Sequence, residues 1–150
     1  MIIKTARFGT LAVEAKSILT IDNGLLAFED LTRFLLLDIA ENVNFKWLQS
    51  IDNPKVAFLL VDPFTIKVDY SVDLNNDLVE QLSISVAEDV LVYTIVTVPK
   101  SGFKNATTNL IGPLIINWTK MRAKQIIYEK KDITIRYPIF PNACKKLNGG

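Results

Sequence analysis

The stretch FKWLQSIDNPKVAFLLVDPF, residues 45–64, consists of two apolar runs on either side of the turn sequence Asp52-Asn53-Pro54. Short apolar runs separated by turn residues of this kind are typical of β-strands. The second run stops at Asp62-Pro63, and because proline has no N–H to donate to a sheet, we expect the strand to end there. The stretch has no catalytic motif, which leaves open whether it only fills the core or also leads into a surface that another protein binds.

The same pattern continues over the rest of the chain. Isoleucine, valine and threonine, which favour strands, recur throughout. A regular series of short strands predicts a mainly β, single-domain, antiparallel β-barrel-like fold. The run at 90–98 lacks polar alternation, so we expect a central strand that is covered on both faces. The other apolar runs span residues 2–7, 10–14, 17–21, 33–39, 65–72, 112–118, 122–129 and 133–137.

One segment, DLVEQL at residues 77–82, has the pattern of a helix. Asp77 is placed to cap this helix while Glu80 reaches back, which is the reciprocal arrangement of a capping box. A further turn of helix is expected around residues 28–32. No linker or repeat divides the sequence, so residues 1–150 are interpreted as a single β domain in which about 142–150 form a flexible tail.

Two absences in the composition bear on function. The chain has no histidine, and its one cysteine is Cys144 near the C-terminus. A single thiol without histidine makes neither a zinc site nor a Cys-His nucleophile, so we predict no metal and no cofactor, while a hydrolase that uses two carboxylates in one pocket stays an alternative. No apolar run reaches the ~18 residues of a membrane span, and the N-terminus lacks a secretory signal, which predicts a cytoplasmic protein.

The formal net charge is +1, but the sign of the charge changes along the chain. Residues 38–90 hold ten acidic and three basic side chains, whereas residues 91–150 hold ten basic and two acidic ones. If folding keeps these segments apart, the first attracts a basic partner and the second an acidic one. If the strands interleave, the asymmetry is blurred, and the sequence leaves both outcomes open.

Part of the basic segment suggests contact with nucleic acid. Lys120, Arg122 and Lys124 alternate along a predicted strand, which places them on one face, with Trp118 and Tyr128 nearby. Cations beside aromatic side chains suit single-stranded nucleic acid, so a direct RNA-binding barrel is one hypothesis. The alternative is a strand with one solvated face, because no RNA-binding signature accompanies these residues.

Five motifs follow one another along the chain: GLLAFED at 24–30, FKWLQSIDNPKVAFLLVDPF at 45–64, VDYSVDL at 68–74, DVLVYTIVTVP at 89–99 and TTNLIGPLIINWTKMRAKQIIYE at 107–129. Together they resemble the FliW family of bacterial flagellar assembly factors, from about residue 8 to residue 139. The chain departs from the family at Leu26-Ala27, where the usual turn has proline and glycine. It also departs at Gly112 and Ala123, where alanine and glycine are usual.

This resemblance implies a small β-barrel-like protein without enzymatic activity that works by binding partners. Proteins of this family bind newly made flagellin and, when free, bind the translational repressor CsrA, a small dimeric RNA-binding protein. Once flagellin is exported, the released protein removes CsrA from the flagellin message. The expected partners are therefore flagellin and a CsrA-type repressor, with no direct contact to nucleic acid or membrane and a monomer in isolation.

Candidate contact residues follow from the charge pattern and the resemblance together. Because an RNA-binding repressor is positively charged, we expect its contacts in the acidic segment, where Asp69 and Asp73 are spaced to share one face of a strand. For flagellin we expect aromatic anchors for an amphipathic helix, although the same side chains would suit the interior. The repressor candidates are Asp62, Phe64, Asp69, Tyr70 and Asp73, and the flagellin candidates are Phe103, Trp118 and Tyr128.

Overall fold

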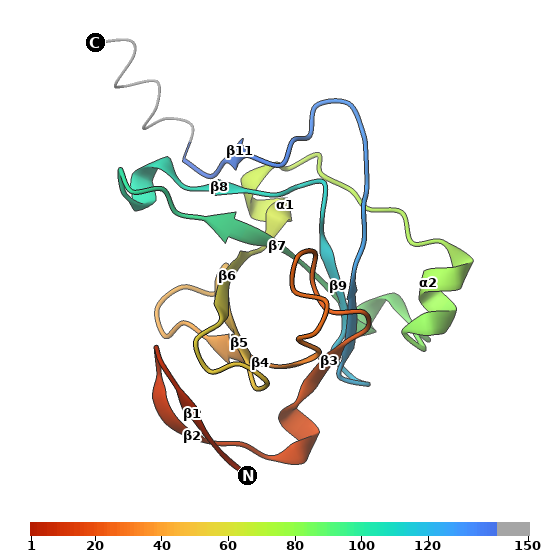
Figure 1. Cartoon of the computed structure of the whole chain (residues 1–150). Coiled ribbons are helices and arrows are strands. Elements are labelled where there is room, and N and C mark those ends of the chain that lie inside the picture. The colour runs from red at the N-terminus through yellow and green to blue at the C-terminus, as the bar shows by residue number, and fades with distance from the viewer. Residues whose placement is uncertain (141–150) are drawn as a thin grey trace.

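A closed barrel of seven strands forms the centre of the molecule (Figure 1). The structure is a computed structural model that describes residues 1–140, so Cys144 and the tail expected at 142–150 lie outside the described residues. Neighbouring strands of the wall pair antiparallel, except that β10 runs parallel to β3 and closes the barrel. In order around the wall the strands are β3 (Leu19–Ile21), β4 (Arg33–Asp38), β5 (Phe45–Ser50), β6 (Ala57–Val61), β7 (Val90–Thr97), β9 (Leu114–Asn117) and β10 (Arg122–Gln125). The predicted mainly β, barrel-like fold is confirmed.

Smaller elements surround this barrel. A hairpin of β1 and β2 lies against its outer side, while β8 and β11 extend the sheet from the edge of β7. The two short helices lie on the connection from β6 to β7. The bounds are β1 (Ile2–Thr5), β2 (Gly9–Ala12), β8 (Thr107–Thr108), β11 (Tyr137–Pro138), α1 (Pro63–Ile66) and α2 (Asn76–Gln81), with 3₁₀ turns η1 (Ala15–Ser17), η2 (Ala87–Asp89) and η3 (Phe103–Asn105).

Side-chain alternation along β5 and β6 decides what fills the barrel. Leu48 and Leu60 are fully buried in the main hydrophobic cluster, whereas the intervening Trp47 and Leu59 pair on the opposite, outer side of the wall. The hairpin covers that outer side, because Phe8 packs edge-on against Trp47 with their ring centroids 5.8 Å apart. The stretch at 45–64 therefore supplies core on one face and a covered exterior on the other.

Strand β7 occupies the central position predicted for residues 90–98. Its first half, Val90 to Tyr93, pairs with β9, and its second half pairs with β6 on one side and β8 on the other. Having three partner strands satisfies its backbone hydrogen bonds along most of its length, which is the requirement for a strand with little polar alternation. This prediction is confirmed.

The strand predicted at 65–72 is wrong. Asp62 accepts a hydrogen bond from the amide of Phe64 at 3.0 Å, and Pro63 occupies the first helical position, where its fixed φ suits a helix. These two residues start α1 immediately after β6 ends at Val61, and a turn from Lys67 to Tyr70 follows. The local start signal therefore outweighs the apolar composition of the segment.

Three further predictions also need correction. Residues 28–32 form turns with an isolated bridge between Leu25 and Phe28, not a helix. The helix predicted at 77–82 exists as α2, but its cap is Asn75, whose Oδ1 accepts from the amide of Leu78 at 2.8 Å. Asp77 lies within the first turn of the helix instead. The strand predicted at 133–137 is reduced to the two residues of β11.

The turn at residues 23–28 keeps a left-handed backbone without the glycine that is usual in the family. Gly24 has φ 64°, and a Cβ there would lie 2.5 Å from the carbonyl oxygen of Phe28, so only glycine fits. Ala27 nevertheless adopts φ 70°. A side chain in this conformation costs about 1 kcal/mol relative to glycine. The departure from the family at Ala27 is thus accommodated as local strain.

Candidate functional site

The exit of β6 presents one exposed aromatic side chain. The half-buried carboxylate of Asp62 caps α1, so it is engaged within the fold. Phe64, two residues later, is 42 % exposed and packs against Tyr70 with ring centroids 5.7 Å apart. Of these two sequence-predicted contacts, Phe64 is the one whose side chain reaches the surface.

Tyr70 supports Phe64 from the interior. Its side chain is buried, and its hydroxyl donates a hydrogen bond to the carbonyl oxygen of Leu110 at 2.7 Å. Burial raises the pKa of the Tyr70 hydroxyl, followed by a smaller effect of Tyr128, so the group stays protonated and keeps donating. Tyr70 thus joins two distant parts of the chain and has almost no surface for a partner.

The charged stripe expected from Asp69 and Asp73 does not form. The segment between α1 and α2 is not a strand, so the two carboxylates do not share a strand face. Asp69 forms an ion pair with Lys67, and the hydrogen bond from Lys67 holds the pKa of Asp69 below its usual value. Asp73 is exposed and has no ion pair within residues 1–140.

Folding brings part of the basic C-terminal segment against this region. The ammonium group of Lys130 donates to Ser71 Oγ at 3.0 Å. Lys130 and Lys131 border the same hollow as Lys67 and Asp69. The acidic and basic segments are therefore mixed here, which is the blurred outcome that the sequence left open.

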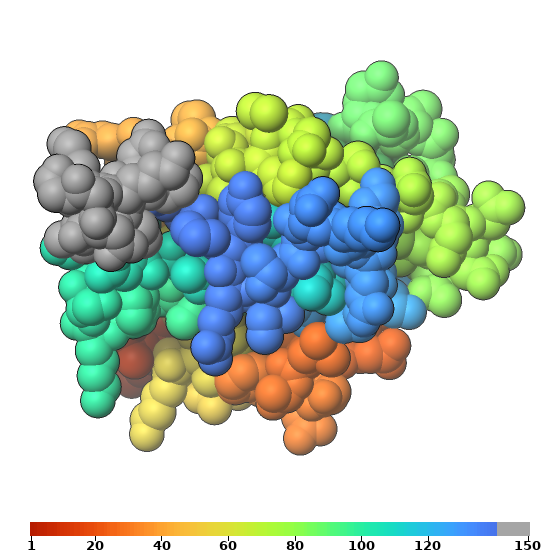
Figure 2. Space-filling model, turned by 90° about the horizontal axis from the view of Figure 1, so that it is seen from above, coloured from red at the N-terminus to blue at the C-terminus, as the bar shows by residue number. Residues whose placement is uncertain are grey.

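A group of acidic side chains lies on or near α2 and η2. We call them the acidic ridge, and none of its carboxylates forms an ion pair with a lysine or arginine in the part of the chain that the structure describes, although Asp89 Oδ1 accepts a hydrogen bond from Thr119 Oγ1 at 2.8 Å. Figure 2 shows residues of this part of the chain projecting at one end of the molecule. The members of the acidic ridge are Asp73, Asp77, Glu80, Glu88 and Asp89.

Trp118 stands beside the acidic ridge in a fixed position. It is 51 % exposed, yet its indole Nε1 donates to the carbonyl oxygen of Glu88 at 2.9 Å and its amide donates to that of Asp89 at 3.1 Å. The preceding Asn117 is buried and donates to the carbonyl oxygen of Leu82 at 2.8 Å, which ties the end of β9 to the end of α2. An exposed aromatic ring held this way is preorganised for contact.

The other two flagellin candidates lie in different surroundings. Phe103 on η3 is 44 % exposed and packs against Phe45 and Phe140, with ring centroids 5.8 and 5.3 Å away. Tyr128 is half-buried, and the Lys130 ammonium lies 5.4 Å from its ring centroid. The neighbours of Phe103, Tyr128 and Trp118 thus differ, and no aromatic ring contact joins any two of the three side chains within residues 1–140.

The basic face predicted from Lys120, Arg122 and Lys124 is incomplete. Lys120 precedes β10 and lies in the turn after β9, so it is not part of the strand. Arg122 forms an ion pair with Asp22 at 3.0 Å. Lys124 donates to Gln81 Oε1 at 2.8 Å. Two of the three cations are therefore engaged inside the fold, and the third is not aligned with them.

Clusters of metal-ligating side chains and long apolar helices are both absent from residues 1–140. Among residues 1–140, no group of three or more His, Cys, Asp or Glu side chains is placed to hold a metal ion. Over the same residues, neither α1 nor α2 has the length and apolar character needed to cross a bilayer.

Sequence reasoning missed the link between Trp118 and the acidic ridge. Trp118 and Glu88 are 30 residues apart in the sequence, and their contact depends on how β9 closes against β7. The one available signal is local, since Trp118 ends an apolar run and is followed by the polar residues Thr119 and Lys120. That signal indicates exposure but does not identify the neighbouring acids.

Comparison with known proteins gives a consistent result. The model of the FliW protein family matches residues 2–139. A flagellar assembly factor FliW from Moorella thermoacetica is 44 % identical over 93 % of this chain and 89 % of its own length, and one from Geobacter sulfurreducens is 38 % identical over 100 % and 93 %. A crystal structure of the flagellar assembly factor FliW matches with a TM-score of 0.84 and 31 % identity, covering 95 % of this chain and 99 % of that one.

Proposed function

The chain belongs to the FliW family of flagellar assembly factors, and from this premise we propose that it controls flagellin synthesis by exchanging partners. It binds flagellin and, when free, a CsrA-type repressor, which it removes from the flagellin message. It acts in the cytoplasm as a binding protein without catalysis, and it does not contact RNA itself. The relatives are named for a role in flagellar assembly.

One observation supports the repressor half of this proposal most directly: an ordered, exposed Trp118 beside carboxylates that form no ion pair within residues 1–140. A protein that binds RNA carries positive charge to neutralise phosphates, so it is attracted to a surface of the opposite sign. A tryptophan face beside carboxylates can also receive an arginine or lysine side chain through a cation–π contact. Trp118 with the acidic ridge therefore offers both long-range attraction and a central anchor.

This proposal shifts the repressor surface relative to the residues expected from sequence. Asp62 caps a helix, Asp69 pairs with Lys67 and Tyr70 is buried, so these three hold the fold together. Phe64 and Asp73 stay exposed and continue as proposed contacts. Asp73 also belongs to the acidic ridge, so it is the residue that the sequence-predicted repressor contacts and the acidic ridge have in common.

For flagellin we propose a separate surface around Phe103. This side chain rests on Phe45 and Phe140 while nearly half of it faces solvent, which suits the apolar side of an amphipathic helix. Tyr128 is less suited, because Lys130 lies over its ring. Trp118 is reassigned from flagellin to the repressor.

A pair of substitutions tests this assignment. Purified protein is titrated with the repressor and, separately, with export-competent flagellin by calorimetry, using Trp118→Ala and Phe103→Ala. Trp118→Ala should weaken repressor binding at least tenfold, about 1.4 kcal/mol, with flagellin affinity unchanged, and Phe103→Ala should do the reverse. The opposite pattern would show that the two surfaces are assigned the wrong way round.

The RNA-binding alternative makes a different prediction. Direct phosphate contacts would give measurable RNA affinity that falls steeply as salt rises. Because Arg122 and Lys124 are engaged with Asp22 and Gln81, we expect negligible binding of single-stranded RNA by the isolated protein. Salt-dependent RNA binding that is lost in Lys120→Glu would favour the alternative.

A further inference from the structure

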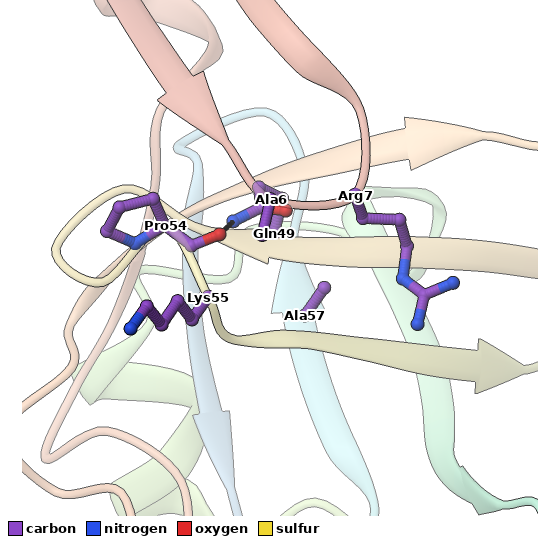
Figure 3. Close-up of a pocket in the computed structure, with 6 residues that line it drawn as sticks. All are labelled: Ala6, Arg7, Gln49, Pro54, Lys55 and Ala57. Atoms are coloured by element: carbon purple, nitrogen blue, oxygen red, sulfur yellow. Dashed lines mark hydrogen bonds between the residues drawn. The ribbon is translucent and has the colours of Figure 1, made fainter.

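A hollow of about 400 Å³ opens between the β1–β2 connection and the turn from β5 to β6 (Figure 3). The amide of Ala6 donates a hydrogen bond to the carbonyl oxygen of Pro54 at 3.0 Å, which joins the two sides of the hollow. None of the surfaces proposed above includes this place. The lining residues are Ala6, Arg7, Gln49, Pro54, Lys55 and Ala57.

Gln49 is a fully buried polar residue in the wall of this hollow. Its Nε2 donates to three carbonyl oxygens, those of Ser50 at 2.9 Å, Val56 at 3.1 Å and Pro54 at 3.3 Å. Three acceptors around one end of the amide fix its orientation, because the reverse orientation would place an oxygen against oxygens. Oε1 then accepts no hydrogen bond from any residue that the structure describes. Buried acceptors without a donor are rare in folded proteins.

The same hollow is bordered by two cations without a counter-ion. Neither Arg7 nor Lys55 has an ion pair within residues 1–140. The carboxylate of Asp52, in the same turn, forms an ion pair with the Arg33 guanidinium, with 2.9 Å between nitrogen and oxygen. The Arg7 guanidinium lies 4.4 Å from the ring centroid of Trp47, which holds it in place by a cation–π contact.

The arrangement of these groups restricts the kind of ligand. Figure 3 shows the side chains of Arg7 and Lys55 extending in opposite directions from the hollow, so one small anion does not suit both. The buried amide oxygen of Gln49 needs an N–H or O–H donor, which a simple carboxylate lacks. An extended peptide with acidic side chains meets both requirements, because it carries a backbone N–H at each residue and negative charges along its length.

We propose that this hollow binds an extended acidic peptide segment of a partner protein. Its carboxylates pair with Arg7 and Lys55, and a main-chain N–H donates to Gln49 Oε1. Since Oε1 is itself closed to solvent, the contact between Ala6 and Pro54 gives way on binding, and a peptide N–H replaces that of Ala6 on the Pro54 carbonyl oxygen. The ligand has the opposite charge to the one that suits the acidic ridge, so this is a separate site that does not rest on the proposed function.

The test is a titration of ¹⁵N-labelled protein, followed by NMR, with a blocked octapeptide of alternating glutamate and glycine. Saturable shifts are expected at the side-chain amide of Gln49 and at the backbone amides of Ala6 and Lys55. The charge reversals Arg7→Glu and Lys55→Glu should each weaken binding at least tenfold. The matched control is Lys4→Glu, on the same hairpin but outside the hollow, and it should change the affinity less than twofold.

Several outcomes would overturn the proposal. If a peptide with glutamine in place of glutamate bound equally tightly, the proposed pairing of its carboxylates with Arg7 and Lys55 would be contradicted. Equal losses of peptide affinity in Lys4→Glu and Arg7→Glu would show that only the overall charge of the hairpin matters. If the NMR signal of the Gln49 side-chain amide did not shift, the proposed hydrogen bond to Gln49 would be contradicted. A single-stranded RNA that shifts the same amides at lower concentration would make the site one for nucleic acid.

Discussion

The acidic ridge and the turn between β5 and β6 both carry carboxylates, but they use them in opposite ways. In the turn, Asp52 accepts hydrogen bonds from the amides of Thr32 and Arg33 at 3.1 Å each and pairs with the Arg33 guanidinium. On the ridge, Asp77 and Glu80 make no side-chain hydrogen bond or ion pair with any described residue. An engaged carboxylate stabilises the fold, whereas a free one is available to a partner. The charges relevant to binding can therefore be counted only after the internal contacts are known.

The largest effect expected from this contrast is on repressor binding. Asp77→Lys combined with Glu80→Lys should weaken repressor affinity about 100-fold, roughly 2.7 kcal/mol, because attraction is replaced by like-charge repulsion. The free energy of unfolding should change by less than about 0.5 kcal/mol, since neither carboxylate is engaged. Calorimetric titration and urea unfolding measure the two quantities.

The matched control for this reversal is Asp30→Lys combined with Glu41→Lys. Both residues are exposed and lie outside the acidic ridge, and the net charge changes by the same amount. If the control weakened repressor binding as strongly as the ridge variant, total charge rather than the ridge would be responsible.

The reciprocal experiment is Asp52→Ala in the turn. This change leaves two amides and a guanidinium without their acceptor, so the protein should lose about 2 kcal/mol of stability, the usual range for hydrogen bonds to a charged group. Repressor affinity should stay the same. Asp38→Ala is a suitable comparison, because its ion pair with Lys46 leaves the Asp38 side chain 85 % exposed and such pairs contribute little. A similar loss in both variants would contradict the distinction between engaged and free carboxylates.

The fold could be predicted from sequence where the signals are local. The strand that ends at Asp62-Pro63 and the central position of β7 follow from apolar runs, turn residues and proline chemistry. The same local reasoning failed at 65–72, where the apolar composition indicated a strand but a cap and a proline started a helix. It also chose Asp77 over Asn75 as a cap, because both side chains can accept the required hydrogen bond.

The candidate site could be predicted much less completely. The sequence identified an acidic segment, but it could not show that Asp69 pairs with Lys67 or that Tyr70 reaches the carbonyl oxygen of Leu110. Nor could it place Trp118 against Glu88. Each of these contacts depends on which loops meet after the barrel has closed, and side-chain spacing along the chain contains no information about that.

A smaller effect is expected at the cap of the helix that carries the ridge. Asn75→Ala removes the acceptor for the amide of Leu78 and should cost about 1 kcal/mol of stability. Because α2 carries Asp77 and Glu80, its fraying should also weaken repressor binding by a few-fold. The adjacent Asn76→Ala is the control, since no side-chain hydrogen bond of Asn76 contributes to the cap. Equal losses from both substitutions would indicate a general effect of removing a polar side chain.

The smallest effect concerns pH and again separates the turn from the ridge. Burial pushes the pKa of Asp52 upward, but hydrogen bonds from the Arg33 and Thr32 amides and the Arg33 side chain outweigh it, so the pKa lies below its usual value. A carboxylate with a lowered pKa in the folded state stabilises the protein above its unfolded pKa, about 3.9, and this contribution is lost as the pH falls through the folded pKa. The stability advantage of the natural chain over Asp52→Asn should therefore be constant from about pH 7 to 5 and shrink below pH 4. Solvent screening at this partly exposed site keeps the change under about 1 kcal/mol.

Urea unfolding at pH 7, 5, 4 and 3 measures this change in the free energy of unfolding. The absence of histidine removes the side chain that most often titrates near neutral pH. An advantage that grew on acidification would mean that the folded-state pKa of Asp52 is raised, which its hydrogen bonds do not allow.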